Sequence, residues 1–127
     1  MTIYWIFAVF VIVGLINVPP EYMYSDYQNP IIVTWNWSFF PVGILFAALG
    51  LFSHFGKSSL HHKQMLSTAS LSLMFCASLM AISFWLIKGE FDPFWWGINL
   101  WLIALSIWGF IGQYRAKNIY NRVAGGL

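Results

Sequence analysis

Three asparagines, Asn17, Asn36 and Asn99, are the side chains best suited to bind a ligand, because each lies in or at the end of a strongly apolar segment. A carboxamide in such surroundings hydrogen-bonds either to a neighbouring helix or to a bound molecule. Two acids, Glu21 and Asp92, lie near the same segments. Six tryptophans accompany them: Trp35, Trp37, Trp85, Trp95, Trp96 and Trp101. Together these residue types can enclose a small amphiphilic molecule between aromatic walls and a few converging polar groups.

Two interpretations of this pattern stay open. In the first, the amides bond across a helix bundle, and the tryptophans form the aromatic belt that is usual at a membrane interface. In the second, they line a pocket that opens towards the outer leaflet. The expected ligand contacts of that pocket are Asn17, Glu21, Asn36, Trp37, Asp92, Trp96 and Asn99.

The sequence gives little support for catalysis or metal binding. His54, His61 and His62 fall in one predicted loop, and their spacing does not match that of metal ligands. The acids are expected on the other side of the membrane, so a Ser-His-Asp arrangement cannot form. The single cysteine, Cys76, excludes an intrachain disulfide and a Cys-x-x-Cys motif. We expect no catalytic residues, no metal and no cofactor.

The composition identifies the environment of these residues. Of 127 residues, 60% are apolar, 20% are aromatic and 8% are charged, whereas soluble domains average about 45–50% apolar and about 25% charged. So few charged side chains cannot cover a water-facing surface, and the chain is too hydrophobic to be disordered. The net charge of +2 is too small for a nucleic-acid-binding protein. The chain is therefore expected to be an integral membrane protein in contact with membrane lipid.

Four apolar segments are candidates for membrane spans, which need about 20 helical residues. They cover residues 3–18, 31–53, 65–87 and 95–113. Short connections favour an up-down arrangement of neighbouring helices. We therefore expect a single transmembrane domain over residues 1–127, all-α, built as a four-helix bundle with a basic tail at 114–127.

The distribution of basic residues predicts the orientation of this bundle. One side carries five bases: Lys57, Lys63, Arg115, Lys117 and Arg122. The other side carries only Lys88, together with all four acids. Basic loops remain in the cytoplasm, so both termini and the middle loop are expected to be cytoplasmic. The expected location is therefore a membrane that borders the cytoplasm.

Small residues predict how two of the helices pack. Gly43, Ala47 and Gly50 lie three and four positions apart on one face of the second span, which allows a neighbouring backbone to approach closely. A matching face is expected on the third span. Its members are Ala69, Ser72, Cys76, Leu79 and Ser83.

Polar residues also mark the fourth span and the starts of two helices. Asn99, Ser106 and Gln113 are seven residues apart and should form one polar stripe. The segments 26–30 and 90–93 each place an acid before a proline, shortly ahead of paired tryptophans. This order is typical of a capped helix start.

Several sequence blocks resemble those of a known family. They are Pro-Glu at 20–21, Tyr-Gln-Asn-Pro at 27–30, Trp-Asn-Trp-Ser-Phe at 35–39 with Pro41, Gly-Glu-Phe-Asp-Pro-Phe-Trp-Trp at 89–96 and Asn-Leu-Trp-Leu at 99–102. On these blocks the chain resembles the YvaD-like family of small four-span bacterial membrane proteins. This resemblance covers most of the chain and implies the topology, but it implies no activity.

A weaker likeness is to the emopamil-binding and sigma-2-receptor group, which also has four spans and an outer loop with an acid and Asn/Asp-Pro before a tryptophan. That likeness implies binding of sterols or amphiphilic amines, or isomerisation of a sterol double bond.

Three functions remain under consideration at this point. The first is non-enzymatic binding of a small hydrophobic or amphiphilic ligand in the outer-leaflet pocket. The second is an accessory or scaffold subunit that packs, through the Gly43, Ala47 and Gly50 face, against a second copy or another membrane protein. The third is a sterol-isomerase-like membrane enzyme, which would need an acid facing an internal cavity.

Overall fold

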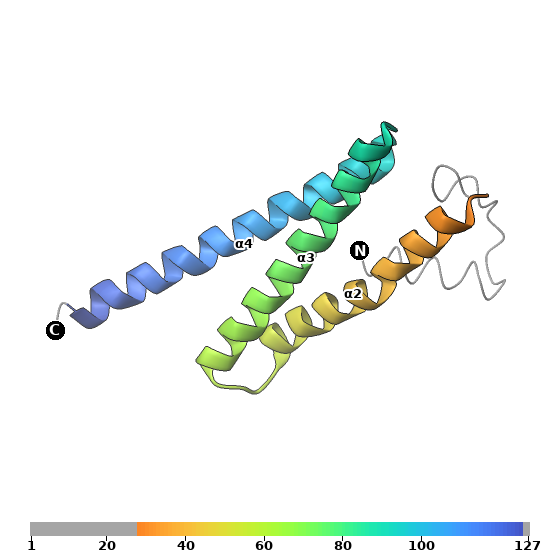
Figure 1. Cartoon of the computed structure of the whole chain (residues 1–127). Helices are drawn as coiled ribbons and strands as arrows, with labels where there is room; N and C mark the ends of the chain where they lie inside the picture. The colour runs from red at the N-terminus through yellow and green to blue at the C-terminus, as the bar shows by residue number, and fades with distance from the viewer. Residues whose placement is uncertain (1–27, 126–127) are drawn as a thin grey trace.

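The computed structural model describes residues 28–125, with side chains up to Arg122. This part of the chain forms three helices and contains no strand: α2 (Pro30–Phe55), α3 (Leu60–Lys88) and α4 (Pro93–Gly125), shown in Figure 1. The first predicted span, 3–18, lies outside the described residues, as do Asn17 and Glu21. The three remaining predicted spans each correspond to one observed helix.

Local sequence accounts for where α2 and α3 begin. The side chain of Asn29 accepts a hydrogen bond from the amide of Ile31 at 3.0 Å, and Pro30 fills the first helical position, where its missing N–H costs nothing. Ser59 caps α3 by accepting from the amide of His62. These side chains satisfy amide groups that the first helical turn leaves without a partner. The capped start that was predicted for segment 26–30 is confirmed at Asn29 and Pro30.

A glycine ends α3 and reverses the chain. Gly89 has a φ of 75°, a left-handed conformation that glycine adopts without the steric cost of a Cβ atom. Its amide donates to the carbonyl oxygen of Leu86, and the amide of Glu90 donates to that of Trp85, both at 3.2 Å. This pair of hydrogen bonds is a Schellman motif. The motif turns the chain within four residues into α4.

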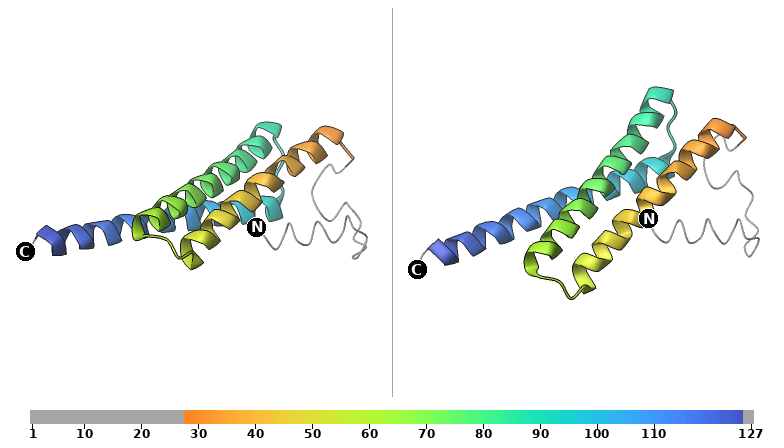
Figure 2. Two further views of the ribbon diagram at one scale, coloured as in Figure 1. Left: turned by 90° about the horizontal axis from the view of Figure 1, so that it is seen from below. Right: turned by 60° about the horizontal axis from the view of Figure 1, so that its bottom comes forward.

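The central helix of the described structure is α3. It packs against α2 on one side and against α4 on the other, whereas α2 and α4 form no direct pairing. The three helices run in alternating directions, and α4 extends well beyond the other two at its C-terminal end (Figure 1, Figure 2). We call the end with the 89–92 turn and the starts of α2 and α4 the acidic end. The opposite end, with the 56–59 turn, is the basic end.

The apolar residues of this structure lie mainly on its outside. Large hydrophobic side chains are exposed along all three helices, for example Leu51, Phe52, Met80, Ile87 and Trp108. Each helix is long and apolar enough to cross a membrane. A surface of this kind is stable in lipid, where backbone polar groups are satisfied inside helices. The protein is therefore an integral membrane protein, as the composition predicts.

The helices are longer than the predicted spans. Helix α3 starts at Leu60, five residues earlier than expected, so His61 and His62 lie in its first turn, and His54 lies in the last turn of α2. The loop between them is residues 56–59 only. The segment 114–125, expected as a tail, continues α4 without interruption.

The predicted packing face of α3 is wrong. Ala69, Ser72, Cys76 and Leu79 are exposed and Ser83 is half-buried. The buried residues of this helix are instead Ala77, Ser78, Ala81 and Trp85. Both faces of α3 are apolar, so small size alone did not identify the face that contacts the neighbouring helices.

Candidate functional site

Asn36 and Asn99 lie on the buried faces of their helices. On α2 the buried residues are Ile32, Asn36, Phe39, Gly43 and Phe46. On α4 they are Trp95, Asn99, Leu102 and Ser106. Both sets follow the three-and-four spacing of a single helix face. The exposed fraction is 3% for Asn36 and 1% for Asn99, so both amides are removed from lipid.

The two asparagines lie equally far along their helices from the acidic end. Asn36 is six positions after Pro30 and Asn99 is six positions after Pro93, the first residues of α2 and α4. This distance is about 9 Å at 1.5 Å per residue. That the two amides share one level in the membrane stays a prediction.

Neither asparagine oxygen has a hydrogen-bond partner in the described part of the chain. The Asn99 amide nitrogen donates to the carbonyl oxygen of Trp95 at 2.8 Å, within its own helix, but Asn99 Oδ1 and Asn36 Oδ1 are both buried without a donor. A buried polar atom that lacks a partner costs about 1–3 kcal/mol. Such an atom therefore calls for a specific explanation.

Three further buried polar atoms near this end also lack a hydrogen-bond partner among the described residues. They are Ser78 Oγ and Trp85 Nε1 on α3, and Trp96 Nε1 on α4. Trp85 and Trp96 each lie three positions from the acidic end of their helices, and Ser78 lies two turns deeper than Trp85. Nothing in the sequence around Ser78 distinguishes it from the other serines, so sequence reasoning did not identify it.

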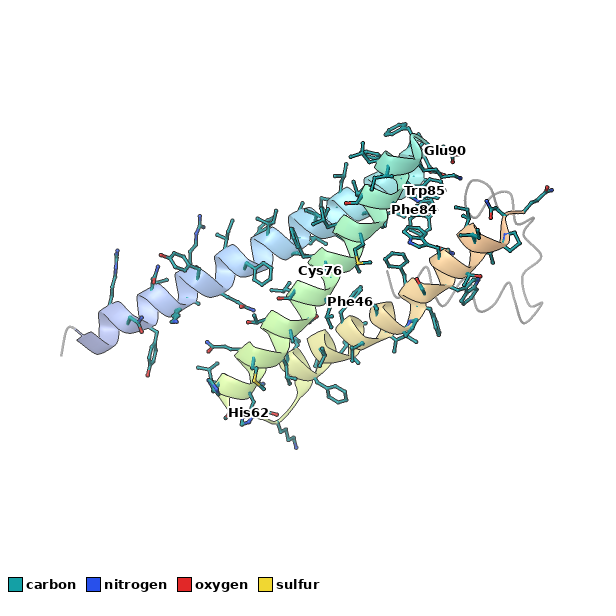
Figure 3. The ribbon with its side chains drawn as sticks, in the orientation of Figure 1. Phe46, His62, Cys76, Phe84, Trp85 and Glu90 are labelled. Atoms are coloured by element: carbon teal, nitrogen blue, oxygen red, sulfur yellow. The ribbon has the colours of Figure 1, made fainter. Side chains whose placement is uncertain are left out.

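An aromatic cluster joins α2 to α3 at the acidic end. The Trp35 ring stacks on Phe84, with centroids 3.9 Å apart and planes at 19°. Its edge meets Trp85 at 6.3 Å and Phe39 at 4.7 Å. Phe84 and Trp85 are labelled in Figure 3, where they lie on the side of α3 that faces α2. This packing fixes the orientation of the buried Trp85 indole.

The other predicted wall residues differ in their placement. Trp95 is buried, and Trp37 and Trp96 are half-buried. Trp37 packs against Phe40 and Trp96 against Phe91. Trp101, by contrast, is 65% exposed, so it does not pack between the helices that the structure describes.

The acidic residues of the described chain have structural roles. Asp92 Oδ1 accepts hydrogen bonds from the amides of Phe94 and Trp95, at 3.0 and 3.1 Å, and so caps α4. This confirms the capped helix start predicted for segment 90–93. Glu90 forms an ion pair with Lys88 at 3.1 Å. The Lys88 ammonium also lies 5.0 Å from the centre of the Trp85 ring, where the ring face attracts a cation.

A shallow apolar groove of about 440 Å³ follows the acidic end of α2. Its lining is Pro30, Ile31, Thr34, Trp35 and Ser38. The hydroxyls of Thr34 and Ser38 donate to carbonyl oxygens of their own helix, at 2.8 and 2.6 Å. The groove therefore offers hydrocarbon surface rather than polar contacts. None of the predicted ligand contacts lines it.

Hydrogen bonds between helices occur in the other half of the molecule. The Gln113 amide nitrogen donates to Ser67 Oγ at 2.8 Å, and the Thr68 hydroxyl donates to Gln113 Oε1 at 2.9 Å. Closer to the middle, the Ser70 hydroxyl donates to the carbonyl oxygen of Phe46 on α2, at 2.7 Å. The expected polar stripe of α4 thus bonds to α3 through Gln113, but not through Asn99 or Ser106, whose donors serve their own helix.

The histidines near the basic end do not gather into one site. His62 Nδ1 lies 2.7 Å from Ser59 Oγ, within the capped start of α3. Among the residues that the structure describes, no three His, Cys, Asp or Glu side chains are close enough to hold a metal ion together.

Most of the sequence matches a known protein family. Residues 1–118 match a family described as "Family of unknown function (DUF5360)". The chain belongs to this DUF5360 family. A relative, "Uncharacterized protein YvaD" of Bacillus subtilis (strain 168), is 32% identical over 106 residues, which are 83% of this chain and 76% of that protein. No solved structure matches this DUF5360 protein. The resemblance to YvaD-like proteins is confirmed, while the likeness to the emopamil-binding group gains no support.

Proposed function

We propose that this protein is a four-span protein of the bacterial cytoplasmic membrane that binds a small amphiphilic ligand at its acidic end, without chemical change. Both termini and the basic end are then cytoplasmic. The fourth span is the apolar segment 3–18. The strongest support for ligand binding is that Asn36 Oδ1 and Asn99 Oδ1, each six positions into its helix, are buried without a hydrogen-bond donor among the described residues.

The chemistry of the buried polar atoms suggests the kind of head group that would bind. Asn36, Asn99 and Ser78 offer oxygens, while Trp85 and Trp96 offer indole N–H donors. A hydroxyl or amide head can donate to the first group and accept from the second. A charged head would enter a site whose buried groups carry no compensating charge, which is strongly unfavourable. An uncharged amphiphile therefore fits best.

Two other functions fit the observations less well. A scaffold role was suggested by the Gly43, Ala47 and Gly50 face, but a Cβ atom on Gly50 would lie 3.1 Å from Ser70 Oγ of α3. That part of the face is therefore used within the chain. An isomerase would need a buried acid, whereas of the two acids that the structure describes Asp92 caps a helix and Glu90 is exposed in an ion pair.

The proposal can be tested by native mass spectrometry of the purified protein with two probes. Monooleoylglycerol carries hydroxyl donors and acceptors, whereas methyl oleate has the same hydrocarbon chain without a donor. We expect the natural protein to retain monooleoylglycerol. In Asn36→Leu and Asn99→Leu the retained amount should fall at least about fivefold, because one missing hydrogen bond weakens binding by about this factor.

The matched control is Ser106→Ala, on the same buried stripe of α4. Ser106 is fully buried, but its hydroxyl already donates to the carbonyl oxygen of Leu102 at 2.8 Å. Its substitution should leave retention of the probe unchanged. Equal retention of both probes, or no difference between the asparagine variants and the control, would contradict the proposal.

A further inference from the structure

A second groove, at the basic end, lies between α3 and α4. Its volume is about 300 Å³, and its lining is Gln64, Thr68, Phe110, Gln113, Tyr114 and Lys117. The groove combines three kinds of surface: the ring of Phe110, the polar ends of Gln64 and Tyr114, and the ammonium group of Lys117.

Contacts between the two helices hold the floor of this groove in place. Gln113 bonds to both Ser67 and Thr68 across the helix pair. One turn earlier on α4, the backbone at Gly109 approaches Leu71 so closely that a Cβ atom there would lie 2.7 Å from its methyl carbon. The groove is therefore a feature of a tight helix crossing and not of a loop.

The length of α4 places the groove at the membrane surface. Tyr114 and Lys117 lie 21 and 24 positions after Pro93, or about 32 and about 36 Å along the helix. A bilayer hydrocarbon core is about 30 Å thick. Gln64 lies 24 positions before Lys88, the end of α3, and so reaches the same level. The polar lining of the groove thus coincides with the layer that holds lipid head groups.

The charges around the groove are of one sign. Lys117 lines it, Arg115 and Arg122 lie on the same helix, and Lys63 lies in the first turn of α3. The acids that the structure describes, Glu90 and Asp92, are at the opposite end of the helices. Lys117 has no carboxylate partner among the described residues. The basic end therefore attracts anions, and the groove gives one anion a defined place.

We infer that this groove binds the phosphate head group of one anionic phospholipid, with its acyl chain along Phe110. Lys117 would supply the charge, and the Tyr114 hydroxyl and the Gln64 amide would donate to the phosphate oxygens. Basic pockets between membrane helices are known to bind such head groups. The site is separate from the proposed ligand site at the acidic end and does not depend on it.

The test uses the full-length protein in mild detergent and native mass spectrometry with phosphatidylglycerol or phosphatidylcholine. We expect one phosphatidylglycerol to be retained in preference to phosphatidylcholine. Lys117→Gln should weaken this retention about fivefold, the effect typical of one basic residue near a lipid surface. Tyr114→Phe should weaken it to a smaller extent.

Arg122→Gln is the matched control, because it removes the same charge from the same helix but lies outside the groove. It should leave retention within about twofold of the natural protein. Equal losses in the two variants would overturn the inference, since they would indicate diffuse attraction rather than a site. Displacement of the lipid by millimolar inorganic phosphate would also overturn it, because the groove would then bind the free ion. Circular dichroism of each variant checks that the helices remain intact.

Discussion

The Ser70 hydroxyl donates to the carbonyl oxygen of Phe46 at 2.7 Å and so joins α3 to α2. Gly50, one turn further along α2, leaves just enough room for this contact, since a Cβ atom there would lie 3.1 Å from Ser70 Oγ. At this point of the helix pair a small residue and a hydroxyl allow close approach, as is usual for helices in lipid, whereas the aromatic cluster around Trp35 joins the two helices at the acidic end.

Substitution of Gly50 should destabilise the α2 and α3 pair. Gly50→Leu places its side chain against Ser70 and should lower the free energy of unfolding by about 1–3 kcal/mol. Gly97→Leu is the control, because no atom lies within 4 Å of a Cβ at that position, and it should have little effect. Unfolding in mixed micelles, followed by circular dichroism, measures both. Equal stability of the two variants would mean that Gly50 is not in a close contact.

A side chain at Gly109 should likewise destabilise the contact between α3 and α4. Its added Cβ would lie 2.7 Å from Leu71 Cδ2, whereas Gly112, on the same helix, has open space. We expect Gly109→Leu to cost about 1–3 kcal/mol and Gly112→Leu to cost nothing measurable. In a double-mutant cycle, Leu71→Ala should recover part of the loss, since the two sites are in contact. Strict additivity in the unfolding experiment would contradict the observed contact.

The two ends of the polar stripe on α4 should respond in opposite ways. Gln113→Leu removes the two hydrogen bonds that join α4 to Ser67 and Thr68 of α3, and should lower stability by about 0.6–1.7 kcal/mol. Asn99→Leu removes a buried amide whose oxygen has no partner among the described residues, and should leave stability unchanged or raise it. The same unfolding assay in ligand-free micelles compares the two variants. A larger loss for Asn99→Leu would show that its amide already contributes to the fold.

The role of Asp92 can be separated from ligand binding by a conservative pair of changes. Asp92→Ala removes the helix cap and should lower stability by about 1 kcal/mol, while Asp92→Asn retains an oxygen for the cap and should stay within a few tenths. Retention of monooleoylglycerol by Asp92→Asn should equal that of the natural protein, because the proposed head group is uncharged. Loss of the probe in Asp92→Asn alone would assign the carboxylate to the ligand site.

The sequence predicts each of the three described helices, but it does not predict where they begin and end. Apolar length identified each span. The first turn of α3, which contains His61 and His62, is polar and was therefore predicted as a loop, although Ser59 caps it as the start of the helix. The segment after Gln113 looked like a tail because its bases are charged, although it continues α4.

The buried faces were harder to predict, for a physical reason. In water a helix buries its apolar face, but in lipid both faces are apolar and no hydrophobic contrast marks the interior. Polar residues were the better guide: Asn36 and Asn99 are buried as the polar pattern indicates, whereas the stripe through Cys76 is exposed. Which buried polar atoms lack partners depends on side-chain geometry, and no sequence pattern contains that information.

The orientation of the bundle is the last prediction, and single cysteines can test it. In a Cys76→Ser background, Phe91→Cys puts a thiol in the 89–92 turn and Lys57→Cys puts one in the 56–59 turn; both positions are exposed. Because basic loops stay in the cytoplasm, a membrane-impermeant maleimide added to intact cells should label the first variant at once. The second should be labelled only after permeabilisation. The reverse pattern would place the acidic end, and the proposed ligand site with it, in the inner leaflet.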